Sequence, residues 1–221
     1  MLKKLREYFC FVLFIIILPY EKSISQSKYE KNFYGGIFYL SEYISSKEFE
    51  EIKLASGDNS AVDSIYNRAV NFFNGDKSEA LLCLTFTCLP FKEIEIKFLF
   101  NKKITIPLPS PSYSLFQAKL KNLPTKIFFD SPENEFGDKD KLSHFFGNAF
   151  LKYNSSFFNL SKFLGIFVEV VERDLFVNGS FDNRDLITNY LGELFGELIK
   201  CNKNILPSDV LKIYQLLFIR F

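Results

Sequence analysis

Tryptophan is absent from this sequence of 221 residues, and histidine and methionine occur once each. A single histidine, His144, excludes zinc sites that are built from several histidines. The sequence also contains no G-x-S-x-G, H-E-x-x-H, P-loop or G-x-G-x-x-G motif. It therefore lacks the usual signatures of serine hydrolases, zinc proteases, nucleotide hydrolases and dinucleotide-binding enzymes.

A block of basic residues is also missing, and the net charge of the whole chain is only +1. Proteins that bind nucleic acids neutralise phosphates with clustered lysine and arginine, so this composition excludes a nucleic-acid partner. The sequence also lacks the lysine and arginine cluster by which some proteins attach to an anionic membrane surface. Hydrophobic residues make up 48% of the chain, which is enough for a folded core of one or two domains.

The first residues have the layout of a secretory signal. A basic start is followed by an apolar run over residues 9–18 and then by polar residues. Ser23 and Ser25 place small side chains where a signal peptidase reads. This pattern predicts that residues 1–25 are a signal peptide and that the mature chain begins at Gln26.

An uncleaved inner-membrane anchor through residues 9–18 is the alternative for the same run, although a membrane span needs about 20 apolar residues. No cysteine follows the run directly, so a lipoprotein is not indicated. Cleavage would remove four basic and two acidic residues, and the net charge would fall from +1 to −1. The mature protein is thus expected to be nearly neutral.

Three cysteines remain after cleavage, Cys83, Cys88 and Cys201. If Leu81–Leu89 is a strand, Cys83 and Cys88 face opposite sides of the sheet and cannot form a disulfide with each other. We expect the cysteines to be small buried hydrophobes. A disulfide between Cys201 and one of the others is the alternative.

The chain from residue 26 to residue 137 predicts an α/β portion. Apolar residues at helical spacing indicate helices over Ile37–Leu54 and over residues 60–73. β-branched and aromatic residues then indicate strands over Leu81–Leu89, Glu93–Phe100 and Ile104–Leu108, the last two joined as a hairpin. A short helix over Ser114–Asn122 and an extended run over Lys126–Phe129 follow, and the acidic loop of residues 130–137 marks a boundary.

Residues 138–221 predict a helical portion. The expected helices are Lys141–Tyr153, Asn159–Phe176, Asn183–Lys200 and Ser208 to the chain end, and short polar loops between them favour antiparallel neighbours. The expected fold class is therefore α+β. It consists of N-terminal helices with a small antiparallel sheet and then a C-terminal antiparallel helical bundle.

Most residues able to do chemistry lie in this second portion. Asp185, Asn189, Gly192 and Gly196 follow one another at steps of four, three and four, so they share one face of a helix. Glycines spaced by four allow another helix to approach closely. We expect the polar residues to converge in one buried cluster made of Asp140, His144, Glu169, Glu172, Asp185 and Asn189.

Each member of the cluster also has a simpler explanation. Asp140 suits the N-cap of its helix, and Asp182 with Asp185 suits a capping pair. Glu172 suits a solvated helix end. His144 suits a hydrogen-bonded core residue as well as a ligand.

These residues resemble a family pattern. Asp140-Lys141-x-x-His144, then Glu169, then Asp185-x-x-x-Asn189-x-x-Gly192-x-x-x-Gly196 is similar to the pattern of VanZ-like membrane proteins and of YfiM-type envelope lipoproteins. The resemblance implies a helical unit in or near the cell envelope and brings no established reaction. The chain departs from the pattern because Glu172 stands where VanZ-like proteins tend to have glutamine, and because its helices are less hydrophobic.

Two functions are compatible with these observations. The first is an exported cell-envelope protein, periplasmic or envelope-associated, that acts as a structural or binding module without a cofactor. Its partner would be an envelope protein or a lipid, with membrane association as part of that expectation. The alternative is a metal- or phosphate-handling hydrolase, in which a divalent ion is held by His144, Glu169, Glu172 and Asp185.

Overall fold

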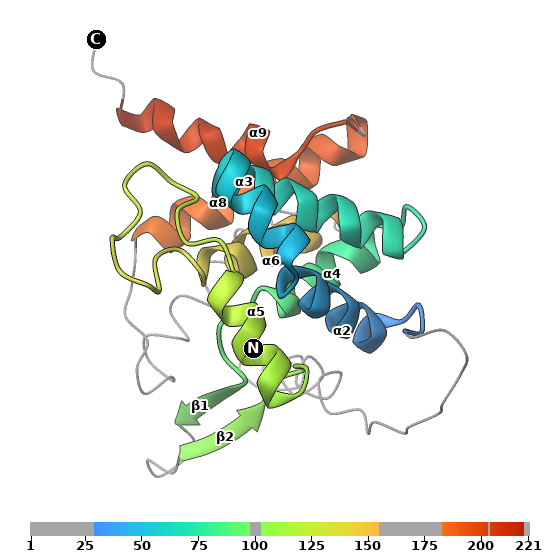
Figure 1. Ribbon diagram of the computed structural model, residues 1–221. Helices are drawn as coiled ribbons and strands as arrows, with labels where there is room; N and C mark the ends of the chain where they lie inside the picture. Colours follow the sequence, from blue (N-terminus) through green and yellow to red (C-terminus); the bar gives the residue numbers. More distant parts are fainter. Residues whose placement is uncertain (1–28, 98–102, 155–182, 203, 219–221) are drawn as a thin grey trace, which may run out of the picture.

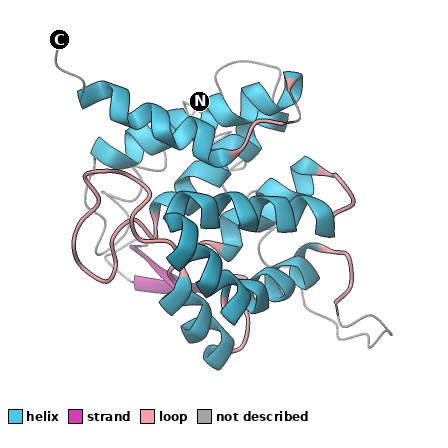
Figure 2. Cartoon of the chain, turned by 45° about the horizontal axis from the view of Figure 1, so that its top comes forward, coloured by secondary structure: helices cyan, strands magenta, loops and turns pink. Residues whose placement is uncertain are grey.

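The computed structural model describes residues 29–97, 103–154, 183–202 and 204–218 (Figure 1). Helices dominate these ranges (Figure 2). The helices are α2 (Phe33–Ile44), α3 (Lys47–Phe72), α4 (Lys77–Thr87), α5 (Tyr113–Asn122), α6 (Lys141–Asn154), α8 (Asn183–Cys201), α9 (Pro207–Leu211) and the 3-10 helix η2 (Lys212–Phe218).

The expected α+β fold class is wrong, because the first predicted strand, Leu81–Leu89, lies almost entirely in helix α4. The carboxylate of Asp76 caps this helix by accepting a hydrogen bond of 3.1 Å from the backbone N–H of Glu79. The buried positions of α4 follow helical spacing: Ala80, Leu81, Cys83, Leu84 and Thr87. Packing of this face outweighs the β propensity of the threonine and aromatic residues in the segment.

One hairpin is the whole of the β structure in the described residues. Strands β1 (Glu93–Lys97) and β2 (Lys103–Pro107) pair antiparallel, with Ile94 opposite Ile106. Two strands of five residues make no sheet layer, and Figure 1 shows them at one edge of the helical body, beside α5. The hairpin is thus an appendage of a helical fold.

The helix expected over Ile37–Leu54 is divided into two. Helix α2 ends at Ile44, and Ser46 starts α3 by accepting a hydrogen bond of 3.2 Å from the N–H of Phe49. The segment between the two helices expected over Ile37–Leu54 and residues 60–73 also belongs to α3, which has a kink at Gly57, where φ is +82°. Only glycine adopts that backbone conformation without strain, which lets α3 change direction without ending.

A single hydrophobic core joins segments from both sides of the loop of residues 130–137. Phe195 of α8 belongs to this core, and its ring centroid lies 5.3 Å from that of Phe145 in α6 and 5.2 Å from that of Tyr66 in α3. Each of these aromatic residues is buried. The C-terminal helices therefore fold against α3 and α4.

Helices α6 and α8 run parallel. Lys141 at the start of α6 contacts Asp185 at the start of α8, and Lys152 near the end of α6 faces Glu193 and Glu197 further along α8. The expected antiparallel arrangement concerns consecutive helices, and the predicted helix Asn159–Phe176 would stand between these two. It lies outside the described residues, so the antiparallel arrangement stays a prediction.

The three cysteines that the structure describes, Cys83, Cys88 and Cys201, are free thiols. Cys83 and Cys88 are buried, and burial raises the pKa of each to about 12. Cys201 is exposed at the end of α8, so the expectation of a buried residue is wrong at this position. Within the part of the chain that the structure describes, none of the helices is both long and apolar enough to cross a membrane. Residues 9–18 lie outside that part.

Candidate functional site

Four of the six residues expected to form the polar cluster meet where α6 packs on α8. These residues are Asp140, His144, Asp185 and Asn189. The other two, Glu169 and Glu172, lie outside the described residues. The candidate site is therefore the polar section of the α6–α8 interface, together with the groups that contact it.

His144 and Asn189 are joined across this interface. Nδ1 of His144 lies 3.2 Å from Oδ1 of Asn189. The amide nitrogen of Asn148, one turn further along α6, donates to the same oxygen at 2.7 Å and to the backbone carbonyl of His144 at 3.0 Å. Asn148 and Asn189 are both more than nine-tenths buried. The side-chain oxygen of Asn189 thus accepts from two nitrogen atoms of α6.

Lys141 pairs with two carboxylates at the start of the interface. Its ammonium lies 2.5 Å from Oδ1 of Asp185 and 3.0 Å from Oδ2 of Asp140, and only 5% of the lysine side chain is exposed. Buried carboxylates need such a counter-charge, because an unpaired one is strongly destabilising.

Asp185 has the most perturbed environment of the cluster. Burial raises the pKa of its carboxyl group, and the nearby His144 and Lys141 oppose that rise. Nε2 of His144 lies 3.8 Å from Oδ1 of Asp185. The aspartate therefore faces both the imidazole and the ammonium of α6.

Gly192 and Gly196 lie on the adjoining section of the same interface. A Cβ atom at Gly192 would overlap the carbonyl oxygen of Phe145, and one at Gly196 would overlap that of Ala149. The helices approach each other closely because both positions lack a side chain. This close approach brings the polar groups of the two helices within hydrogen-bonding distance.

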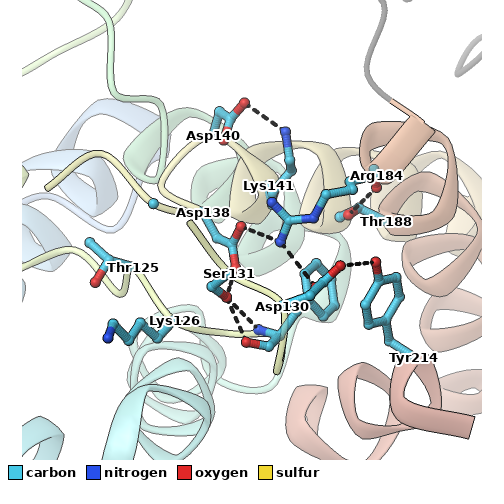
Figure 3. Close-up of polar contacts among 12 residues, drawn as sticks. Thr125, Lys126, Asp130, Ser131, Asp138, Asp140, Lys141, Arg184, Thr188 and Tyr214 are labelled. Carbon is cyan, nitrogen blue, oxygen red and sulfur yellow. Dashed lines mark hydrogen bonds and ion pairs between the residues drawn. The ribbon is translucent and has the colours of Figure 1, made fainter. Parts of the chain in front are cut away.

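A second polar network lies beside the first and is drawn in Figure 3. Arg184, at the start of α8, donates to Oδ1 of Asp138 at 2.7 Å, and Ser131 donates to the other oxygen of that fully buried carboxylate. Arg184 also lies 3.5 Å from Asp130, which accepts a hydrogen bond of 2.7 Å from the hydroxyl of Tyr214.

This second network ties three segments together. Asp130, Ser131 and Asp138 belong to the loop before α6, Arg184 to α8, and Tyr214 to η2. Phe128 contacts two members of this network. Its ring centroid lies 4.4 Å from the ring centroid of Tyr214 and 5.6 Å from the guanidinium carbon of Arg184. The loop that was expected to be a boundary is therefore anchored to the C-terminal helices.

No family model, curated protein or solved structure matches this chain. The resemblance to VanZ-like and YfiM-type proteins thus stays a prediction. Among the residues that the structure describes, no three histidine, cysteine or acidic residues are grouped so that they could hold a metal ion. The proposed metal ligands Glu169 and Glu172 are not among them.

The predicted cluster left out Asn148 and Lys141, although Lys141 stands in the Asp140-Lys141-x-x-His144 pattern. Asn148 stands four residues after His144, and Lys141 stands three residues before it, so helical spacing alone places all three on one side of α6. That spacing was a usable signal. Arg184 carried no comparable signal, because its partners Asp138 and Asp130 lie in a distant loop.

Proposed function

We propose that this protein is an exported cell-envelope protein in which the α6–α8 cluster serves structure or binding and performs no reaction. The position of Lys141 carries the proposal. Its ammonium stands between Asp140 and Asp185, where a hard divalent cation would have to bind. A carboxylate that is already paired in this way is poorly placed to hold a metal or to act as a general base.

The other contacts agree with a structural role. His144 and Asn148 both use the amide oxygen of Asn189, so two nitrogen atoms of α6 share one acceptor of α8. Such a network specifies how two helices pack, because any other register leaves buried polar groups unpaired. The partner of the protein would be another envelope protein or a lipid, bound by surfaces outside this cluster.

The alternative function is a metal- or phosphate-handling hydrolase that uses the same residues. The approach of His144 to Asp185 favours it, because an imidazole beside a carboxylate is a frequent pair in acid–base catalysis. That function would require Asp185 to leave Lys141 or to share it with an anionic substrate.

A thermal-melting series separates the two functions. The wild-type protein is melted with added Mg²⁺, Ca²⁺ or Zn²⁺ and again with excess chelator. The structural proposal expects no change in the melting temperature. A rise that depends on metal concentration and is reversed by the chelator would contradict the proposal, because a ligand that binds only the folded state stabilises it.

Two variants sharpen the experiment. Lys141→Met should lower stability by roughly 3 kcal/mol, because it leaves buried carboxylates without their counter-charge. Divalent metal should restore part of the loss if charge neutralisation is the role of Lys141. Lys126→Met is the matched control, since Lys126 pairs with Glu133 at the surface and should show neither effect.

A further inference from the structure

Two buried amide groups in the α6–α8 interface are only partly used by the protein. Within the part of the chain that the structure describes, Oδ1 of Asn148 and Nδ2 of Asn189 accept and donate no hydrogen bond. Both side chains are more than nine-tenths buried. Buried polar atoms in folded proteins are paired in the great majority of cases, so this acceptor and this donor require a partner.

The orientation of both amides follows from their neighbours. Asn148 must direct its nitrogen at the backbone carbonyl of His144, because its oxygen would repel that carbonyl at 3.0 Å. Asn189 must then direct its oxygen at the nitrogen of Asn148, 2.7 Å away. Turning either amide over places two donors or two acceptors against each other, so neither unused atom can be satisfied by a flip.

The two unused atoms lie near each other. The oxygen and nitrogen of one planar amide are about 2.3 Å apart, and the atoms that join Asn148 to Asn189 are 2.7 Å apart. The unused oxygen and nitrogen are therefore separated by at most about 7 Å. A single water molecule, or two in a chain, reaches across such a gap with ordinary hydrogen bonds.

We infer that Asn148 and Asn189 form an internal water site, filled by one molecule or by a chain of two, which donates a hydrogen bond to Oδ1 of Asn148 and accepts one from Nδ2 of Asn189. The site selects against cations because Nδ2 presents hydrogen atoms. It selects against anions because Oδ1 presents lone pairs. Water is the molecule of this size that offers both a donor and an acceptor.

The site adds a function to the cluster that does not depend on the proposed role of Lys141. A bound water completes the hydrogen bonds of the polar section of the interface, so α6 and α8 are joined through it as well as by direct contact. Asn189 then links three partners, which are His144, Asn148 and the water.

Nuclear magnetic resonance of the wild-type protein in water tests the inference. At about pH 5, where exchange of side-chain amide protons is slow, the Hδ2 protons of Asn189 should show a nuclear Overhauser effect to water. Its sign should be that of a water held for longer than a nanosecond. Overhauser effects from these protons to protein protons alone, or a sign typical of surface water, would overturn the inference.

A count of long-lived internal waters provides a second measurement, by oxygen-17 or deuterium relaxation dispersion. Asn148→Leu should reduce the count by at least one relative to the wild type. The control is Asn67→Leu, which replaces an exposed asparagine in α3 and should leave the count unchanged. An unchanged count in a folded Asn148→Leu variant would overturn the site. If that variant does not fold, the wild-type Overhauser measurement decides.

Discussion

The carbonyl oxygen of Phe145 in α6 occupies the space that a side chain at Gly192 in α8 would need. Gly196 has the same relationship to the carbonyl oxygen of Ala149, one turn further along. The blocking atoms belong to the backbone, so they cannot move aside as the end of a flexible side chain can. The close helix crossing is therefore a strict requirement of this interface.

Substitution of either glycine should destabilise the protein. We expect Gly192→Ala and Gly196→Ala each to lower the free energy of unfolding by roughly 1 to 3 kcal/mol, and the leucine variants to lower it further, because α6 and α8 are forced apart. Urea denaturation measures the change. Gly147→Ala is the control, since a Cβ there meets only the side chain of Thr85, at 3.2 Å. Unchanged stability of Gly192→Leu would mean that the helices do not cross here.

Removal of the side-chain amide of Asn189 should also lower the stability of the protein. Asn189→Ala removes the acceptor that serves His144 and Asn148, and it leaves their buried nitrogen atoms without that partner. We expect a loss of roughly 1 to 3 kcal/mol in the free energy of unfolding. Denaturation with urea beside the surface control Asn67→Ala measures it. Equal stability of the two variants would remove Asn189 from the packing of the interface.

Lys119 should make the free energy of unfolding rise with pH on the alkaline side, relative to a variant that lacks this lysine. This lysine of α5 is 1% exposed, and its ammonium donates to the carbonyls of Thr87 and Leu89 at 2.7 and 2.9 Å, at the end of α4. Burial lowers its pKa from 10.5 to about 8, and a weaker interaction with Cys88 opposes the shift.

Between these two pKa values the unfolded chain binds more protons at Lys119 than the folded protein does. The contribution of Lys119 to the free energy of unfolding should therefore increase from pH 8 to pH 10.5, by about 3 kcal/mol at most. The buried thiols of Cys83 and Cys88, whose pKa is raised to about 12, act in the opposite sense above pH 9 in the wild type and in the variants alike. Urea denaturation at several pH values should show this rise for the wild type relative to Lys119→Met. The exposed Lys121→Met is the control and should follow the wild type. Parallel pH profiles of the wild type and Lys119→Met would contradict the expected shift.

If the protein is exported with cleavage of residues 1–25, its mature form should have one N-terminus, near Gln26. The protein recovered from an expressing cell should begin near Gln26 when it is sequenced from its N-terminus, because the basic start, the apolar run and the small residues at Ser23 and Ser25 direct cleavage there. Ile15→Arg, which places a charge in the apolar run, should block processing. A wild-type protein that retains Met1 would show that the signal is not cleaved.

Local periodicity was sufficient to locate several helices. The predicted ranges Ser114–Asn122, Lys141–Tyr153 and Asn183–Lys200 agree with α5, α6 and α8 to within one residue at each end. The polar and glycine stripe of α8 follows from the same spacing, because every third or fourth residue of a helix lies on one face whatever surrounds it. These features depend on neighbouring residues alone.

Other features depended on contacts between distant residues. Leu81–Leu89 has the composition of a strand, yet it is helical because its apolar residues pack on α2, α3 and α6. The pairing of Lys141 with Asp185 and the burial of Lys119 against the end of α4 likewise join segments far apart in the chain. The sequence alone determined which residues share a helix face. Only the tertiary structure decided which faces meet, because burial and charge pairing stabilise an arrangement of the whole chain.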